Sequence, residues 1–220
     1  MTSSVIPMPN SQGESPAVSR NRAPAFALPS ILGLYAFAAG TFIVAALMAH
    51  WYGSAQSAII VFPLLLILGG LAQFYAGAWA FRTNNATAMV MHGTWGSFWA
   101  AYAILELLYA SGRVVRPQGA FPELGIWFVV AAAITWGITV AARQDKGMTT
   151  VLALLAVGST LEGIAELAGV AWLRVLAGYF LIASALVAWY VASALMMRLG
   201  QKDKAQSATP VAPSESERVA

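Results

Sequence analysis

Residues 57–80 read SAIIVFPLLLILGGLAQFYAGAWA and contain no charged side chain. A helix of this length spans the roughly 30 Å of hydrocarbon in a lipid bilayer. Because lipid offers no hydrogen bonds to the backbone, a long unbroken apolar run is stable there as a helix. This stretch therefore predicts a transmembrane α-helix, and Pro63 inside it predicts a local kink.

Similar apolar stretches lie on either side of this one, at residues 30–50, 86–110, 121–142, 148–170 and 173–198. Of the 220 residues, 59% are hydrophobic and 10% are charged, whereas soluble domains carry about 25% charged residues. The pattern predicts an all-α membrane protein whose six transmembrane helices form a channel-like bundle over residues 26–199. The polar segments 1–25 and 200–220 are expected to be disordered tails.

The composition also argues against several classes of function. The chain has no cysteine and only two histidines, His50 and His92, so neither a metal centre nor a catalytic set can be assembled. We therefore expect no cofactor and no enzyme activity. The net charge is +3, but the basic residues form no stripe, so nucleic acid is not an expected partner.

Lysines and arginines predict the orientation of the chain in the membrane. Three of them, Arg113, Arg116 and Arg174, would lie on one side. The nine on the other side are Arg20, Arg22, Arg82, Arg143, Lys146, Arg198, Lys202, Lys204 and Arg218. Because cytoplasmic loops are enriched in such residues, both termini are expected in the cytoplasm, with the protein in the plasma membrane.

Small residues recur every four positions in two of the predicted helices. The rows are Ala72, Ala76 and Ala80 in one helix and Gly93, Ser97 and Ala101 in the next, and Gln73 lies between Gly69 and Gly77 at the same spacing. Rows of small residues allow helix backbones to approach closely within lipid. Gln73 needs hydrogen-bond partners at this depth, and it could either cross-link two helices or face a polar path.

The third predicted helix carries aromatic and polar side chains on its opposite face. These residues are His92, Trp95, Trp99, Tyr102, Glu106 and Tyr109. One interpretation is an aromatic core or a stripe at the membrane boundary, where Trp and Tyr are common. The other is a pore lining in which the rings form a narrow apolar gate.

Three carboxylates, Glu106, Glu162 and Glu166, lie within the predicted spans. A charge at the centre of a bilayer costs roughly 2.5–3.5 kcal/mol, so such residues face a cavity, form pairs or take up a proton. Glu162 and Glu166 lie one helical turn apart, where they could share a proton. They could equally pair with Arg174 near the end of their helix at Gly169. We regard all three glutamates as candidates for proton coupling.

The stretch GGLAQFYAG at residues 69–77 is followed by WAFRTNN at 79–85 and GTWGSFW at 93–99. This combination resembles the acetate uptake transporter family, which includes acetate/succinate–proton symporters and yeast acetate or ammonia transport proteins. The resemblance implies a six-helix, channel-like protein for small monocarboxylates. It also implies a homo-oligomeric ring, commonly a hexamer.

The same resemblance implies a narrow apolar constriction, which the family builds from a phenylalanine, a tyrosine and a leucine. Phe37 matches the phenylalanine and Trp95 the tyrosine, while the leucine matches Met148 or, as a second choice, Leu152. The stretch LPSILGLYAF at residues 28–37 matches the family's first-helix motif but lacks its leading asparagine and its second proline.

Hydrogen-bonding side chains near this constriction are candidates for contact with the substrate carboxyl group. They are Thr41, Gln73 and Ser97. We expect transport of acetate and similar small monocarboxylates, with succinate as a further candidate, coupled to protons. One alternative is a channel for a small neutral solute such as ammonia or urea. Another is a membrane scaffold or sensor that transports nothing.

Overall fold

The computed structural model describes residues 29–54 and 56–208, and these ranges contain helices but no strand. In chain order the helices are α1 (Pro29–Met48), α2 (Ser57–Leu64), η1 (Leu65–Ala72), α3 (Gln73–Arg82), α4 (Ala86–Ala110), α5 (Pro122–Ala141), α6 (Lys146–Ala168) and α7 (Ala171–Ala208). Because α2, η1 and α3 follow one another without a break, the helices form six long segments, as predicted.

By length and composition, five segments of the described chain can cross a membrane. They are Pro29–Met48, Ser57–Arg82, Pro122–Ala141, Lys146–Ala168 and Ala171–Gln201. The sixth segment, α4, has 25 residues, but it carries the polar and aromatic residues that the sequence places on one face. The chain is an all-α membrane protein, which confirms the predicted fold class.

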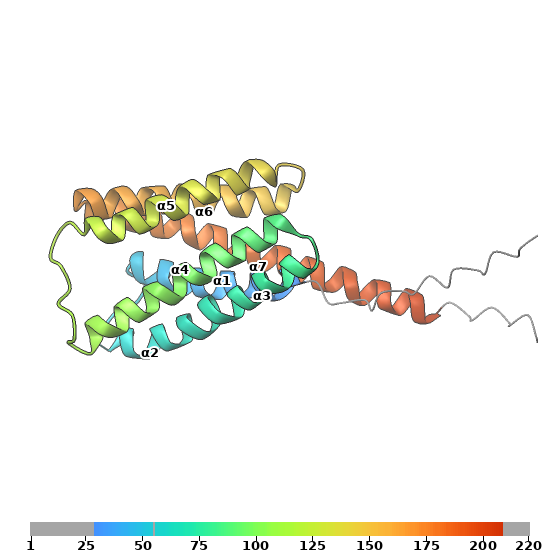
Figure 1. The fold of residues 1–220 in the computed structure, drawn as a ribbon, viewed down its shortest axis with the longest axis horizontal. Coiled ribbons are helices and arrows are strands. Elements are labelled where there is room, and N and C mark those ends of the chain that lie inside the picture. Colours follow the sequence, from blue (N-terminus) through green and yellow to red (C-terminus); the bar gives the residue numbers. More distant parts are fainter. Residues whose placement is uncertain (1–28, 55, 209–220) are drawn as a thin grey trace, which may run out of the picture.

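The six segments run side by side along the length of the bundle (Figure 1), and their contacts close a ring. Going round the ring, α1 packs against α7, α7 against α6, α6 against α5, and α5 against α4. The continuous segment of η1 and α3 lies between α4 and α1 and closes the ring. The contact between α4 and α5 is the least extensive.

The predicted kink site at Pro63 is where the regular α-helix gives way. Pro63 lies inside α2, and the π-helix η1 begins two residues later, at Leu65. Proline has no N–H to donate, so the normal hydrogen-bond pattern is interrupted there. The wide turns of a π-helix accommodate such an interruption, and they occur frequently at functional sites.

Glycines bring the backbones of three segments close together. A Cβ atom on Gly40 of α1 would lie 2.8 Å from Cα of Gly69 in η1. A Cβ atom on Gly77 of α3 would lie 2.8 Å from the backbone nitrogen of Gly93 in α4. Neither position has room for a side chain, so these small residues serve close helix packing.

The loops distribute the described charges between the two ends of the ring. Figure 1 shows the start of α1 and the far part of α7 at one end of the bundle, together with the α3–α4 and α5–α6 loops. Arg82, Arg143 and Lys146 belong to that end. Arg113 and Arg116 precede α5, and Arg174 follows the start of α7, at the opposite end.

The helix ends also bear on the predicted boundaries. Gly169 terminates α6 with a φ angle of 68°, at the predicted end of that span. The helix α7 continues to Ala208, so the predicted boundary between residues 199 and 200 falls within it. The predicted tail at 1–25 lies outside the described residues.

The Gly77–Gly93 approach predicts a specific loss of stability. We expect Gly77→Ala to destabilise the protein by about 1–3 kcal/mol, because the added methyl group would overlap the backbone of α4. Thermal unfolding in detergent would show a lower midpoint. Gly137→Ala is the matched control, since a Cβ atom there has nothing within 4 Å. Equal midpoints for the two variants would contradict this account of the packing.

Candidate functional site

The interior of the ring is filled at mid-length by a single cluster of buried apolar side chains. Phe37, Trp95 and Leu152 belong to it and have no exposed surface. At 1.5 Å per residue they lie about 12, 14 and 9 Å from the first residues of α1, α4 and α6. These three helices begin at the same end of the bundle (Figure 1), so the three side chains lie at similar depth.

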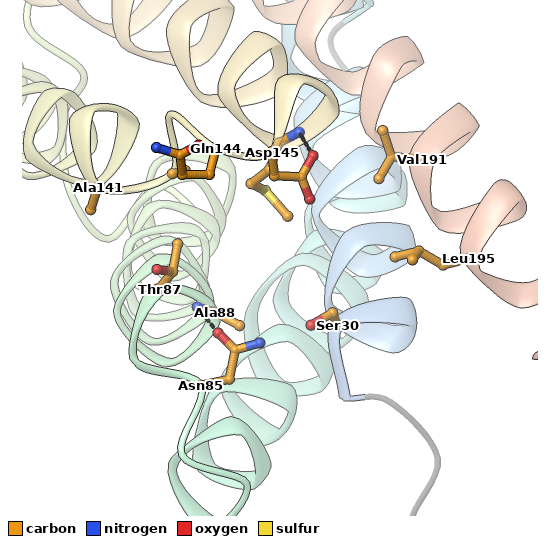
Figure 2. A pocket seen from close by; sticks show the side chains of 11 residues that line it. Ser30, Asn85, Thr87, Ala88, Ala141, Gln144, Asp145, Val191 and Leu195 are labelled. Carbon is orange, nitrogen blue, oxygen red and sulfur yellow. Dashed lines mark hydrogen bonds between the residues drawn. The ribbon is translucent and has the colours of Figure 1, made fainter.

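A cavity of about 390 Å³ lies on one side of this cluster, at the end where α4 and α6 begin. We call it the Asn85 cavity; its lining residues come from α1, α4, α5, α6 and α7 and from the α3–α4 and α5–α6 loops, and Figure 2 shows their side chains around it. Its lining residues are Ser30, Asn85, Thr87, Ala88, Ala141, Ala142, Gln144, Asp145, Met148, Val191 and Leu195. Met148 therefore lies at the cavity, whereas Leu152 lies one turn deeper, in the apolar cluster.

The polar side chains of the Asn85 cavity also hold helix ends in place. Asn85 Oδ1 accepts a hydrogen bond of 3.0 Å from the backbone N–H of Ala88, and Asp145 Oδ1 accepts one of 3.0 Å from Met148, both drawn in Figure 2. These contacts cap α4 and α6, whose first N–H groups have no partner within the helix. The mouth of the cavity is thus built from rigid helix ends.

A second cavity, of about 230 Å³, lies at the opposite end of the ring. We call it the Arg174 cavity. Its lining residues are Leu47, Met48, His50, Tyr102, Glu106, Arg116, Glu162, Glu166 and Arg174. All three glutamates that the sequence places within the spans are therefore gathered at one site.

Ion pairs hold the three glutamates. Glu106 of α4 pairs with Arg116 in the following loop, and Glu166 of α6 pairs with Arg174 of α7. Glu162 Oε1 lies 3.4 Å from Nε of the same Arg174. The glutamate side chains are only 4% exposed, which explains why they require guanidinium partners. The structure thus favours pairing with Arg174, one of the two alternatives left open by the sequence.

Arg116 is the partner that the sequence did not predict. Burial alone lowers the pKa of its guanidinium, but the hydrogen bond and the negative charge of Glu106 outweigh this and raise the pKa above its ordinary value. Arg116 therefore stays charged at every physiological pH. Its guanidinium also lies 4.8 Å from the centre of the Tyr109 ring, which orients it further.

Several buried polar atoms inside the ring have no hydrogen-bond partner among the described residues. Thr41 Oγ1, His92 Nε2 and Trp99 Nε1 are three of them. Buried polar atoms are normally paired, so unpaired ones are open to water or a polar solute. Thr41 lies one turn beyond Phe37 on α1, so an apolar and a polar contact follow one another on the same face.

The buried side-chain amide of Gln73 has a hydrogen-bond partner for its nitrogen and another for its oxygen. Its Nε2 donates to the carbonyl oxygen of Gly69 at 2.8 Å, and its Oε1 lies 3.4 Å from Nδ1 of His92 on α4. The His92 ring is fully buried and packs against Gly33 of α1, which has no room for a side chain. Gln73 therefore links α3 to α4.

Trp95 is held by a residue that sequence reasoning missed. Its Nε1 donates a 2.9 Å hydrogen bond to Thr135 Oγ1 on α5, and Thr135 in turn donates to the Ala131 carbonyl at 2.7 Å. The ring also packs against Trp99, at 5.6 Å between centroids. The sequence contains no signal that pairs α4 with α5 at this point.

Ser97 is the predicted site residue that the structure does not bring into the interior. It is exposed on the outer face of α4, and its hydroxyl donates to the Gly93 carbonyl at 2.8 Å. The aromatic stripe occupies the inner face instead, with His92, Trp95 and Trp99 fully buried. The aromatic residues and Ser97 therefore lie on opposite faces of α4, as predicted.

A family model supports the resemblance inferred from the motifs. The model described as the GPR1/FUN34/yaaH family matches residues 12–209. The chain belongs to this family. The finding confirms the resemblance to acetate uptake transporters, since the family includes the proteins of that group.

Named relatives and a solved structure support the assignment of the chain to this family. The succinate-acetate/proton symporter SatP of Escherichia coli (strain K12) is 26% identical over 156 residues, which cover 68% of this chain and 81% of SatP. The ammonia transport outward protein 2 of Saccharomyces cerevisiae is 27% identical over 173 residues, covering 77% of this chain and 61% of the yeast protein. The solved structure of the bacterial acetate channel SatP matches with a TM-score of 0.71 and 21% identity, over 85% of this chain and 99% of that one.

These names describe transporters and channels, which confirms the expectation of a transport protein rather than an enzyme. The match to the solved channel shows that the two chains share a fold. The two cavities and the apolar cluster between them are thus features of a transporter family member.

The Gln73 contacts predict a loss of stability on substitution. We expect Gln73→Leu to lower the free energy of unfolding by about 1–3 kcal/mol, because His92 would keep a buried nitrogen without its partner. Thermal unfolding monitored by tryptophan fluorescence would report the change. Ser97→Ala, on the exposed face of α4, should leave the midpoint within error. A Gln73→Leu protein as stable as Ser97→Ala would show that the Gln73–His92 contact does not stabilise the fold.

Proposed function

We propose that this chain carries acetate and similar small monocarboxylates across the plasma membrane, each accompanied by a proton, with succinate as a further substrate. The passage runs inside each protomer, from one cavity to the other. The observation that supports it is the apolar cluster of Phe37, Trp95 and Leu152, which separates two cavities, each with polar side chains in its lining, at opposite ends of the ring. The names of the relatives agree with this substrate class.

The apolar cluster would act on the charge of the solute. An ionised carboxylate loses its hydration when it enters an apolar constriction, at a cost of many kcal/mol, whereas a neutral carboxylic acid loses far less. Phe37, Trp95 and Leu152 therefore favour passage of the acid in neutral form, with Met148 at the entrance from the Asn85 cavity. A hydrophobic constriction with polar flanks is an effective way to select and gate.

Two polar side chains would assist the solute beside the constriction. Thr41 offers an unpaired hydroxyl group one turn from Phe37. Gln73 would exchange its contact with His92 for one with the carboxyl group. Ser97 lies on the exposed face of α4, where it would contact α5 or a neighbouring subunit rather than the solute.

The arrangement in the membrane follows from the charges at the two ends. We propose that the Asn85 cavity and both termini face the cytoplasm, because Arg82, Arg143 and Lys146 gather at that end and cytoplasmic loops are enriched in such residues. The Arg174 cavity would then face the outside. Each protomer has its own passage in this arrangement, and several protomers would assemble as a homo-oligomeric ring, a hexamer by family resemblance.

Transport of ammonia is a second candidate, favoured by the name of the yeast relative. A small neutral solute would also cross an apolar constriction cheaply. Counterflow separates the two functions, because vesicles preloaded with acetate would accelerate entry of labelled acetate only if acetate shares the passage.

Acetate uptake should depend on external pH. Labelled acetate should enter proteoliposomes several-fold faster at about pH 6 than at about pH 8, because the passage favours the protonated acid. Acetic acid also crosses lipid unaided, so the rate in protein-free vesicles is subtracted at each pH. A protein-dependent rate that is the same at both values would contradict proton coupling, and the absence of such a rate would contradict acetate transport.

Trp95 should set the size of the permitted solute. We expect Trp95→Ala to raise the rate for propionate and butyrate relative to acetate by several-fold, because the ring that narrows the cluster is removed. Trp95→Tyr introduces the residue type found in the family and should give an intermediate ratio. It provides the test if the alanine variant does not fold. Trp189→Ala is the control, because Trp189 is 46% exposed on α7. Unchanged ratios in both Trp95 variants would remove Trp95 from the constriction.

A further inference from the structure

The Arg174 cavity contains more negative than positive charge. Three glutamates line it, against the two guanidinium groups of Arg116 and Arg174. Each glutamate also keeps one buried oxygen without a hydrogen-bond partner in the described part of the chain, namely Glu106 Oε1, Glu162 Oε2 and Glu166 Oε2. With all groups ionised, the cavity thus carries one surplus negative charge and three unused acceptor atoms.

The surplus charge falls on Glu162. Glu106 and Glu166 each hold a guanidinium nitrogen directly, through Arg116 Nη2 and Arg174 Nη2. Glu162 shares Arg174 with Glu166, and its nearer oxygen lies 3.4 Å from Nε. Its side chain is 4% exposed, so water cannot screen the charge. Protonating Glu162 would cost less pairing energy than protonating either of the others.

Ionisable groups lie on or near the Arg174 cavity from every element packed around it, although not all of them line it. His50 comes from the end of α1, Tyr102, Glu106 and Tyr109 from α4, Arg116 from the next loop, Glu123 from α5, Glu162 and Glu166 from α6, and Arg174 from α7. Among the described residues that line the cavity, His50, Arg116 and Arg174 are the bases. His50 is exposed at the rim and does not compensate the buried surplus.

Arg116 is the group best placed to receive an anion from outside. Its side chain is 48% exposed, and its described ion pair uses one of three guanidinium nitrogens. A planar guanidinium binds carboxylates through two parallel N–H donors, so Arg116 retains an edge for a second carboxylate. Arg174 is less exposed, at 38%, and uses two nitrogens on glutamates.

We propose that the Arg174 cavity loads a small carboxylate and a proton together, with the carboxylate on Arg116 and the proton on Glu162. This inference rests on the proposed function and assigns its coupling step. A bare anion would raise the surplus from one negative charge to two in a buried site. An anion taken with a proton leaves the net charge of the cavity unchanged.

The step balances without any other reactant. The substrate carboxylate forms hydrogen bonds to Arg116, and one O–H bond forms on Glu162 with a proton from the outside solution. Transfer of that proton to the bound carboxylate then breaks the O–H bond on Glu162 and yields a neutral acid, with Glu162 ionised again. Glu162 lies ten residues beyond Leu152 on α6, about 15 Å along the helix, so the neutral acid forms before it reaches the apolar cluster.

The test measures acetate uptake into proteoliposomes over a range of external pH, with a trapped pH-sensitive dye that reports proton entry. If one proton is bound with each acetate, the apparent affinity for the acetate anion rises up to ~10-fold for each unit decrease in pH. In Glu162→Gln this slope should fall below about 2-fold per unit, because the cavity is then balanced and takes the anion alone. Glu123→Gln is the control, since Glu123 is exposed at the same end and does not line the cavity.

The carboxylate site is tested separately. Arg116→Gln should raise the acetate concentration at half-maximal uptake by ~10-fold or more, corresponding to the loss of one charge-assisted contact. Arg113→Gln in the same loop is the control, because Arg113 is exposed and outside the cavity lining. A shift in Arg116→Gln no larger than in Arg113→Gln would overturn the assignment of Arg116.

The outcomes also distinguish this inference from the proposed function. If the unmodified protein does not transport acetate, the proposed function fails. If it does, and Glu162→Gln keeps the pH slope of Glu123→Gln, the assignment of Glu162 is overturned while the function stands. Gel filtration confirms that each variant is folded. Should Glu162→Gln not fold, Glu162→Ala provides the same test because it also removes the carboxyl group, and a normal slope in that variant with a slope lost in Glu166→Gln would assign the proton to Glu166 instead.

Discussion

Close approach of helix backbones is the constraint on which the rest of this structure depends. Helices gain nothing from hydrophobic association within lipid, so van der Waals contact between small residues must hold them together. Gly40 against Gly69 and Gly77 against Gly93 fasten α1, η1, α3 and α4 at backbone distance. The buried aromatic and polar side chains of the interior are placed by these contacts.

This constraint also explains why the polar groups beside the apolar cluster are so tightly packed. Gln73 lies one turn after Gly69, and it donates to that glycine's carbonyl while reaching His92 on α4. The His92 ring fits only because Gly33 has no side chain. A close helix contact and a buried polar link therefore occur at the same place and support one another.

The membrane spans and the packing of small residues could be predicted from the sequence because both depend on local composition and spacing. The same holds for the inner face of α4, where His92, Trp95 and Trp99 recur at helical intervals. The structure places Ser97 on the exposed face of α4 rather than beside the predicted constriction, and its small size suits either a helix contact or a polar lining. The sequence provides no information that distinguishes these two environments.

Contacts between segments distant in the chain were beyond sequence reasoning. The Glu166–Arg174 pair could be anticipated, because both residues lie close to the turn at Gly169. Arg116 meets Glu106 only through the course of a long loop, which no periodic pattern describes. Thr135 accepts a hydrogen bond from the Trp95 indole where α4 meets α5, which is the least extensive contact of the ring. The sequence of neither helix alone indicates that these two residues are partners.

The two cavities differ in a way that bears on the direction of proton movement. The Arg174 cavity gathers five charged side chains, whereas Asp145 is the one ionisable residue that lines the Asn85 cavity in the described chain. Asp145 also caps α6 through Oδ1, so the ionisable residue of the Asn85 cavity already holds a helix end. In the proposed passage, the protein handles the proton at the Arg174 end, and water receives it at the other. Such a protein would recognise the ionised substrate on one side of the membrane and release the neutral acid on the other.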